Sequence, residues 1–308
     1  MTQRVLVTGA SGFVGTAVVE QLLASHYDIT ALVHRGDLKP GLESVRVVRG
    51  DLFTDSVLDK AVEDCDAVIH LVGIIKEIPR RGITFDRIHV HGAKNVLDAA
   101  QRAGIQRIIH MSALGAAAEA PSEYHKTKFM AEHRLRKSTM DWTILQPSLI
   151  HGPQGEFTRM LAAWARGKKP PFFFMPYFGG GLLGLSKPTQ VQPVYVRDVA
   201  RAFVDAIDNE QTNHKTLPVC GSQVLTWPQM YKIAAQLFAG KRKPALPIPA
   251  WYAKAVASII PAKLLPFTKD QVQMAESDNT ADMSEFAAAF GWEPRAFEET
   301  AHDYANEV

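Results

Sequence analysis

Cysteine is scarce in this chain of 308 residues, which contains only Cys65 and Cys220. The two have no companion pair and do not show the short spacing of zinc ligands. We therefore expect no disulfide framework and no metal site, and a reducing compartment.

Long apolar runs and basic blocks are also missing. No stretch reaches the roughly 20 apolar residues of a membrane helix, and no apolar signal segment precedes the first strand-like run, Arg4–Val7. The 34 Lys and Arg residues balance 32 Asp and Glu residues without any run of five or six cations, which argues against a nucleic-acid partner. These absences predict a cytoplasmic protein.

The composition is that of a globular protein, with 46% hydrophobic and 21% charged residues. Up to about Ser148, short β-branched runs alternate with amphipathic helical patterns, which predicts βαβ units. The predicted strands are Val5–Thr8, Ile29–Val33, Arg46–Arg49, Ala67–Leu71, Arg107–Ser112 and Trp142–Gln146, and the predicted helices include Val14–Ala24, Ser56–Val62 and Ile88–Ala103. The fold class is therefore α/β, a Rossmann-type doubly wound parallel sheet.

The pattern changes after Pro147. A helix is expected over Glu156–Ala165, a loop rich in aromatic residues over 170–181, and a strand and helix that return to the sheet over Gln192–Ala206, with a last strand at Thr216–Val219. From about Leu225 the pattern is helical, with proline-rich joints at 244–249 and 261–266. We predict a Rossmann domain over 1–150, continued by 191–222, and a smaller, mostly helical substrate or interaction lobe over 151–190 and 223–308.

A glycine-rich turn follows the first predicted strand. Gly9, Gly12 and Gly15 recur at every third position at the mouth of a predicted helix. In a Rossmann fold such glycines form a tight turn, let the backbone approach a pyrophosphate and let the helix pack against the strand, while the helix N-terminus offers N–H groups to the phosphates. We predict a dinucleotide site, the alternative being a βα turn without a ligand.

The end of the second predicted strand indicates which dinucleotide is bound. NAD enzymes usually place a carboxylate there for the ribose diol, whereas this chain has His34 and Arg35. The guanidinium of Arg35 can pair with a 2′-phosphate, which favours NADP(H) over NAD(H); a solvated arginine is the alternative. Asp51, after the third strand, can accept a hydrogen bond from an adenine amino group or act as a helix cap.

Tyr124 and Lys128 stand four residues apart in a helical pattern, so both side chains share one helical face. An ammonium beside a phenol favours the phenolate and is expected to lower its pKa, which suits Tyr124 as a general acid or base at a nicotinamide ring. Lys128 can also hold the nicotinamide ribose. A surface pair without a function is the alternative.

The order of these motifs, together with Leu71-Val72-Gly73 and Gln146-Pro147-Ser148, resembles the extended or atypical short-chain dehydrogenase/reductase family, which is NAD-dependent epimerase/dehydratase-like. Residues 68–73, 110–116 and 192–200 are similar to a branch that contains the nucleotide-binding accessory subunit of respiratory complex I and free-standing bacterial relatives. The resemblance implies that the following residues line the cofactor: Gly9, Ser11, Gly12, Phe13, Val14, Gly15, Arg35, Asp51, Leu52, Leu71, Val72, Gly73, Tyr124, Lys128 and Pro147.

The sequence departs from the family at two catalytic positions. Ala113 takes the place of the usual catalytic hydroxyl, and Ser112 is the candidate to replace it beside Tyr124 and Lys128. The family's helix asparagine is absent, with His89 and His91 nearby. A missing hydrogen bond to the transition-state oxyanion costs about 3 kcal/mol, so slow or absent turnover is an expectation.

Two functions therefore compete. The first is an NADP(H)-dependent oxidoreductase, or an epimerase-like enzyme, acting on a carbonyl or hydroxyl group of a small, apolar molecule; a nucleotide sugar is a third choice. The second is a non-catalytic NADPH-binding structural or sensory protein in peripheral contact with a membrane or a respiratory complex at the inner membrane face. The aromatic segment 172–178 is either core packing, a wall for an apolar substrate, or a contact patch flanked by Lys168, Lys169 and Lys241–Lys243.

Overall fold

The computed structural model describes residues 3–39, 41–186, 188–260, 265 and 267–308. The chain divides into two compact units. Unit 1 comprises residues 1–147, 196–219 and 283–293, and unit 2 comprises residues 148–195, 220–282 and 294–308.

Unit 1 is built on a seven-stranded sheet in which every neighbouring pair of strands is parallel. The strand order is β11-β6-β5-β4-β1-β2-β3, so the direction of winding reverses between β1 and β4. The strands are β1 (Arg4–Thr8), β2 (Asp28–Val33), β3 (Arg46–Arg49), β4 (Ala67–His70), β5 (Arg107–Met111), β6 (Asp141–Pro147) and β11 (Lys215–Val219). This order confirms the predicted doubly wound fold, in which ligands bind outside the carboxyl ends of the strands at the reversal point.

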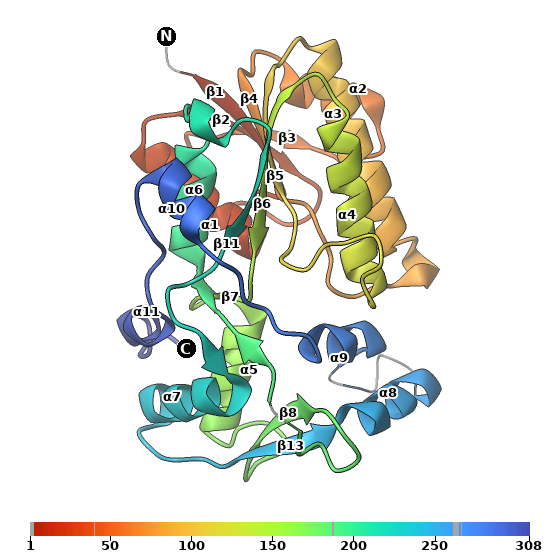
Figure 1. Ribbon diagram of the computed structural model, residues 1–308. Coiled ribbons are helices and arrows are strands. Elements are labelled where there is room, and N and C mark those ends of the chain that lie inside the picture. The colour runs from red at the N-terminus through yellow and green to blue at the C-terminus, as the bar shows by residue number, and fades with distance from the viewer. Residues whose placement is uncertain (1–2, 40, 187, 261–264, 266) are drawn as a thin grey trace. The chain divides into compact units, whose positions relative to one another are not determined.

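Helices cover both faces of this sheet (Figure 1). One face carries α2 (Asp55–Val62), α3 (Gly92–Arg102) and α4 (Glu123–Arg136), and the other carries α1 (Phe13–Ala24) and α6 (Val196–Asp205). Between the sheet and α2, α3 and α4, side chains such as Leu6, Val68 and Ile108 are fully buried against Leu58 and Val96. Apolar residues on both faces of the strands are therefore explained by the two helical layers.

The helix predicted over Ile88–Ala103 is not one regular helix. A π-helical turn, η2 (Asp86–His91), precedes α3, and the two follow a short 3-10 turn, η1 (Pro79–Arg81). The widened turn leaves His89 almost fully buried. Such π-turns are frequent at functional sites.

Unit 2 contains three two-stranded sheets and five helices among its described residues. The sheets pair β7 (Ile150–His151) with β10 (Val194–Tyr195), β9 (Gln190–Val191) with β12 (Leu225–Thr226), and β8 (Met175–Gly179) with β13 (Ala245–Pro249). The helices are α5 (Glu156–Ala165), α7 (Trp227–Ala239), α8 (Ala250–Ile259), α9 (Lys269–Ala275) and α11 (Phe297–Asp303). No helix in the described ranges is both long enough and apolar enough to cross a membrane.

Three expectations for the later part of the chain were wrong. Within the aromatic segment predicted to be a loop, residues 175–179 form strand β8 while the rest is irregular, and residues 245–249 of the proline-rich joint form β13. Prolines are tolerated in β13 because a two-stranded sheet leaves one edge of each strand without a partner. The strand expected at the start of Gln192–Ala206 pairs with β7 in unit 2 instead of returning to the large sheet; the joint at 261–266 lies mostly outside the described residues.

Helix α10 (Ser284–Phe290) belongs to unit 1, although the sequence prediction assigned 223–308 to the smaller lobe. Its Phe286 is fully buried and stacks on Phe290, and the Trp292 ring lies edge-on to Phe286. Trp292 also lies under Arg201 of α6 and donates to Asp205. The contacts of Trp292 attach the segment to α6, and no local sequence period encodes them.

The guanidinium of Arg107, at the start of β5, links four separate segments of unit 1. It donates to the Asp141 carbonyl at 2.7 Å, the Thr143 hydroxyl at 2.8 Å and the Thr212 hydroxyl at 2.9 Å. It also donates to the carbonyls of Ala206 and Ile207, after α6. Burial lowers the pKa of Arg107 to about 10, so it remains charged at neutral pH.

We expect Arg107→Met to lower the free energy of unfolding by about 3 kcal/mol, because it leaves several buried acceptors without a donor. Urea denaturation measures the change. The matched control is Arg102→Met, because the Arg102 ion pair with Asp59 is exposed and its loss has little effect. Equal effects of the two substitutions would contradict the anchoring role of Arg107.

Candidate functional site

The glycine-rich turn lies between β1 and α1 at the reversal point of the sheet. Gly9 has a positive φ of 77°, and its carbonyl accepts a hydrogen bond from the Gly12 amide at 3.0 Å. A Cβ on Gly15 would lie 2.0 Å from the Gly9 carbonyl oxygen, so only glycine lets α1 approach the turn this closely. A Cβ on Gly9 would meet the Val72 amide nitrogen at 3.2 Å, which places the loop after β4 beside the turn.

The first turn of α1 is open to an anion. Gly12 is its N-cap residue, so no side chain caps the helix, and no acidic residue lies in its first turn. Ser11 and Gly12 are exposed, Phe13 is half-buried and Val14 is buried. Free N–H groups at a helix N-terminus, without a competing carboxylate, suit a phosphate group.

Arg35 is exposed just beyond β2, on the same carboxyl edge of the sheet as the turn. It makes no hydrogen bond or ion pair with any residue that the structure describes. The neighbouring Arg49 instead pairs with Asp37. The Arg35 guanidinium is therefore available to a ligand.

Asp51 follows β3 and is engaged with its own loop. Its Oδ1 accepts hydrogen bonds from the Phe53 amide at 2.8 Å and the Thr54 hydroxyl at 3.0 Å. The bond from the Phe53 amide lowers the pKa of Asp51 below its usual value, so the carboxylate is charged. Leu52 is buried, and its carbonyl accepts a hydrogen bond from the Asn95 amide at 2.9 Å. The N-cap residue of α2 is Thr54, so Asp51 is not the helix cap weighed as its alternative role but holds the loop before α2, and adenine recognition stays a prediction.

Lys128 is buried in α4 with its ammonium at the carboxyl edge of the sheet. Its Nζ donates to the Met111 carbonyl, at the end of β5, at 2.9 Å. A Cβ on Gly73, after β4, would lie 3.0 Å from the same Nζ. Burial lowers the pKa of Lys128 to about 8. Leu71 is buried and Val72 is half-buried. Because Val72 approaches Gly9 and Gly73 approaches the Lys128 ammonium, segment 71–73 lies between the glycine-rich turn and Lys128.

Tyr124 lies one helical turn before Lys128, and its ring is enclosed by other rings. Phe85, His89 and His125 pack edge-on to it, with ring centroids 5.2 to 5.8 Å away. Burial raises the pKa of Tyr124 to about 12. The expectation that Lys128 lowers this pKa was wrong, because the Lys128 ammonium is directed to the Met111 carbonyl and burial dominates at the phenol.

Ser112 is buried at the end of β5, and its hydroxyl has no hydrogen-bond partner among the described residues. Its amide donates to the Leu145 carbonyl at 2.8 Å, while Ala113 beside it is also buried. The next residue, Leu114, donates from its amide to the Pro147 carbonyl at 3.0 Å, at the end of β6. An unpaired buried hydroxyl is costly, so Ser112 is suited to meet a ligand group.

Three buried histidines surround the Lys128 region, and sequence reasoning gave none of them a site role. A hydrogen bond of 2.9 Å joins His89 Nδ1 and the Thr127 hydroxyl, and His89 Nε2 lies 3.1 Å from the Ile74 backbone. His70 contacts the Thr8 hydroxyl through Nδ1 at 2.7 Å and stacks on His110. Burial, followed by the charge of Lys128, lowers the pKa of His89 to about 2 and that of His70 to about 3, so both are neutral.

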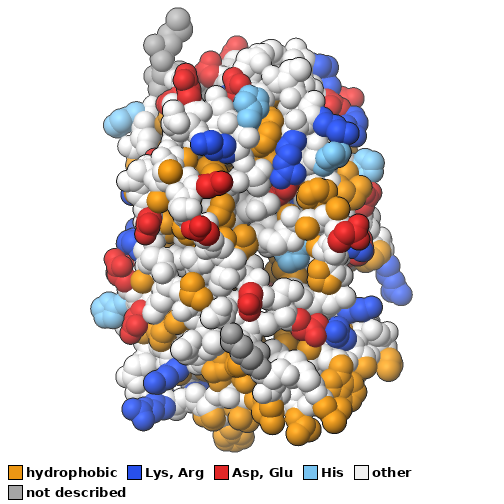
Figure 2. Space-filling model, viewed as in Figure 1, with side chains coloured by type: hydrophobic (Ala, Val, Ile, Leu, Met, Phe, Trp, Pro, Cys, Tyr) orange, Lys and Arg blue, Asp and Glu red, His pale blue; other side chains and the backbone are white. Residues whose placement is uncertain are grey.

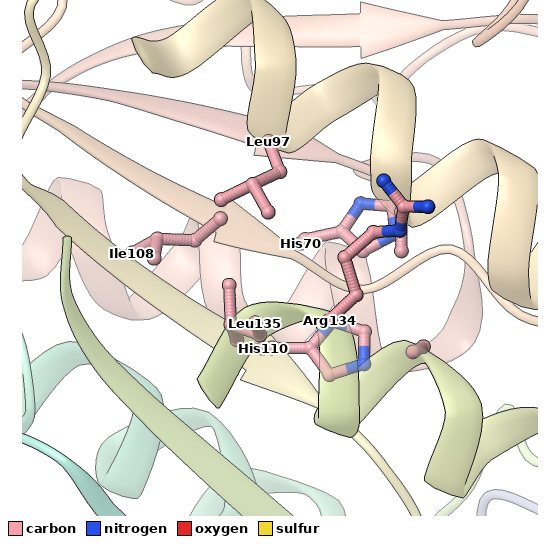
Figure 3. Close-up of a pocket in the computed structure, with 8 residues that line it drawn as sticks. His70, Leu97, Ile108, His110, Arg134 and Leu135 are labelled. Atoms are coloured by element: carbon pink, nitrogen blue, oxygen red, sulfur yellow. The ribbon is translucent and has the colours of Figure 1, made fainter. Parts of the chain in front are cut away.

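A small cavity lies between His70 and His110 of the sheet and the helices α3 and α4 (Figure 3). Its volume of about 10 Å³ admits roughly one water molecule, not a nucleotide. Leu97 of α3 and Arg134 and Leu135 of α4 also line it. The nucleotide candidates lie instead at the carboxyl ends of the strands, so this cavity is not the predicted cofactor site.

The sequence offered one signal for these histidines. His89 falls near the place where the resembled family has its helix asparagine, but only the π-turn shows that His89 is buried and bonded to the Ile74 backbone. His91 is exposed beside Asp86. His70 and His110 sit at the ends of apolar strands, where their role depends on which helices cover them.

Comparisons with known proteins agree with this geometry. A family model described as NAD(P)H-binding matches residues 9–164. The ceramide reductase of Caulobacter vibrioides is 30% identical over 240 residues, which cover 77% of this chain and 71% of that protein. Subunit 9 of the NADH dehydrogenase [ubiquinone] 1 alpha subcomplex from Dictyostelium discoideum, a mitochondrial protein, is 22% identical over 286 residues, which cover 89% of this chain and 76% of that protein.

Among solved structures, the UDP-glucose 4-epimerase of Thermus thermophilus in complex with NAD superposes with a TM-score of 0.75. The two chains are 21% identical, and the match covers 99% of this chain and 98% of the epimerase. This likeness concerns the fold. Since the family model spans half of the chain, the chain belongs to the family described as NAD(P)H-binding.

Proposed function

We propose that this protein is an NADP(H)-dependent oxidoreductase that reduces a carbonyl group on a small, apolar substrate. The observation that carries the proposal is the buried ammonium of Lys128, held between Gly73 and Met111 one helical turn after Tyr124. A buried cation costs several kcal/mol, and a ribose or phosphate group at this edge would repay part of that cost.

The residues fit a dinucleotide at this edge of the sheet. Gly9, Gly12 and Gly15 would make room for the pyrophosphate at the start of α1. Arg35 would bind the 2′-phosphate. Segment 71–73 and Lys128 would bind the nicotinamide ribose. Pro147, Leu52, Asp51 and the side chains of Ser11, Phe13 and Val14 complete the proposed lining. The reduced cofactor supplies a hydride when it is bound.

Tyr124 is the proposed proton donor. Because its pKa is about 12, the phenol is protonated at neutral pH and can donate its proton to a substrate oxygen as that oxygen gains charge. This favours reduction over oxidation, since oxidation would require the phenolate. The Ser112 hydroxyl, which lacks a partner among the described residues, would donate a second hydrogen bond to the same oxygen in place of Ala113. An epimerase-like reaction would use the same groups with the hydride returned to the substrate.

The substrate class rests on the 30% identity to a protein named ceramide reductase, which indicates an apolar carbonyl compound. A nucleotide sugar is less favoured, because the likeness to the epimerases is one of fold.

We expect Tyr124→Phe to lower NADPH-dependent reduction of a panel of small, apolar ketones at least a hundredfold, because the proton donor is lost. Ser112→Ala should cost about tenfold to a hundredfold, since one hydrogen bond to the oxyanion disappears. Stopped-flow absorbance of NADPH measures the rate. Thr127→Ser is the control with conserved polarity, and full activity of Tyr124→Phe would exclude this mechanism.

Nucleotide affinity should fall with rising pH. Since burial gives Lys128 a pKa of about 8, the free protein loses this ammonium as pH rises through 8, and binding of NADH should weaken about tenfold between pH 7 and pH 9. Tyr124 and the buried histidines stay neutral over this range. Isothermal titration calorimetry measures how NADH affinity depends on pH. The Lys128→Met variant should bind NADH weakly at every pH, and a pH dependence that persists in this variant would have to come from another group.

Preference for NADP(H) depends on Arg35 in this proposal. Arg35→Ala should weaken NADPH binding about tenfold to a hundredfold and leave NADH binding within about twofold, because only the 2′-phosphate loses its partner. Fluorescence titration of both nucleotides compares the variants, with Arg49→Ala as a neighbouring control. Equal losses for the two nucleotides would remove Arg35 from the 2′-phosphate site.

A second candidate function is a nucleotide-binding protein without turnover, associated with a membrane complex. Ala113 at the place of the usual catalytic hydroxyl favours it, as does similarity to proteins named as subunits of NADH dehydrogenase. Denaturing the purified protein and identifying the released nucleotide by mass spectrometry separates the two. Nucleotide that stays bound during dialysis and does not exchange with added nucleotide favours the structural role. Nucleotide that exchanges freely favours the enzyme.

A further inference from the structure

Two segments of unit 2 differ from the rest of the chain in charge. Residues 166–190 and 240–269 together contain ten Lys and Arg residues and no Asp or Glu. The remaining residues contain 24 Lys and Arg and 32 Asp and Glu. The nearly neutral chain therefore concentrates its positive charge in these two segments.

The structure brings the two segments together. Strands β8 and β13 pair along their whole length, from Ala245 beside Met175 to Pro249 beside Gly179. The Lys243 ammonium donates to the Phe172 carbonyl at 2.6 Å, and the Trp251 indole donates to the Leu182 carbonyl at 3.0 Å. Hydrogen bonds therefore fix both the 170–174 loop and the 180–186 loop to the second segment.

This part of unit 2 exposes large apolar side chains. Phe173 is 85% exposed, Ile259 82%, Leu182 78% and Leu185 72%. We call the α8 patch the set formed by Phe172, Phe173, Leu182, Leu183, Leu185, Leu246, Trp251, Tyr252, Ile259 and Ile260. Figure 2 shows hydrophobic side chains gathered where β8, β13 and α8 lie in Figure 1, with Lys and Arg side chains beside them.

Helix α8 is apolar on both of its faces. Ala250 and Ala253 are buried in a small core with Val272, Phe178 and Phe267. The opposite face carries Trp251, Tyr252, Ala255 and Ile259, all exposed. Its one charged residue, Lys254, is half-buried and paired with Glu276 at 2.9 Å. An amphipathic surface helix would place charges outward, so α8 is built for a second apolar environment.

We propose that the α8 patch docks on the surface of a membrane that contains anionic phospholipid. The apolar side chains would enter the boundary between headgroups and acyl chains, where Trp and Tyr are favoured. The exposed Lys168, Lys169, Lys241 and Arg242 border the patch in sequence and would meet the headgroup phosphates. Absence of any acidic residue in both segments fits an anionic bilayer better than a protein surface of mixed charge.

The proposal does not depend on the enzymatic function, since its test measures no turnover. The full-length protein is mixed with vesicles of phosphatidylcholine, with or without about 30% phosphatidylglycerol, and bound protein is measured by co-sedimentation. We expect binding to the anionic vesicles at least tenfold stronger than to the neutral ones, weakening with salt.

Two variants and their matched controls locate the contact. Phe173→Ser, Leu183→Ser and Ile259→Ser together should weaken binding at least tenfold, whereas Val47→Ser, Met130→Ser and Val224→Ser, which change exposed but less accessible apolar side chains outside the α8 patch, should not. Lys241→Glu with Arg242→Glu should weaken binding to anionic vesicles at least tenfold, whereas Lys137→Glu with Lys232→Glu, of the same net charge, should change it little. Since the substituted side chains are exposed, the variants should keep the native circular dichroism spectrum.

Each outcome decides the proposal. Loss of binding in the patch variants alone supports it. Absence of binding by the native protein to anionic vesicles at low salt would overturn it and leave the α8 patch as a surface for a protein partner. Equal loss in the control variants, or binding unchanged in the patch variants, would show that the α8 patch is not the contact.

Discussion

The buried ammonium of Lys128 is the constraint on which the rest of the candidate site depends. It lies at the end of β5, where it donates to the Met111 carbonyl, and beside Gly73 in the loop after β4. A side chain at Gly73 would crowd this ammonium, and burial, followed by the charge of Lys128, lowers the pKa of His89 and His70 so that both are neutral. A buried charge with so few partners is stabilised best when a ligand supplies more, which links the stability of this region to nucleotide binding.

The same environment fixes the character of the proposed acid. Phe85, His89 and His125 enclose the Tyr124 ring and keep its phenol protonated, whereas an exposed pair of tyrosine and lysine would favour a more acidic phenol. The π-turn that buries His89 also ties the loop after β4 to α4 through Ile74 and Thr127. One histidine, His89, therefore positions both Tyr124 and the loop after β4. That histidine occupies the region where the resembled family uses an asparagine.

The charge of the whole chain is nearly balanced, but its distribution along the sequence is uneven, and unit 2 holds two strongly basic segments. Its two basic segments meet through the β8–β13 pairing and expose aromatic and aliphatic side chains beside lysines. Proteins seldom leave so many large apolar side chains in water without a partner for them. An apolar substrate and a membrane contact would be compatible uses of one protein, because such substrates reside in bilayers.

Local sequence determined most of unit 1. The β-branched runs and the glycine-rich turn fixed the order of strands and helices and the position of Gly9, Gly12 and Gly15, because strand and helix periods and close backbone approach are local properties. The spacing of Tyr124 and Lys128 fixed their common face. Only the tertiary structure decided their electrostatics, since the direction of the Lys128 ammonium and the burial of Tyr124 depend on β5 and η2. Tertiary structure likewise decided that residues 175–179 form a strand, that 283–293 belong to unit 1 and that the apolar residues near α8 face outward, because each depends on contacts between segments far apart in the chain.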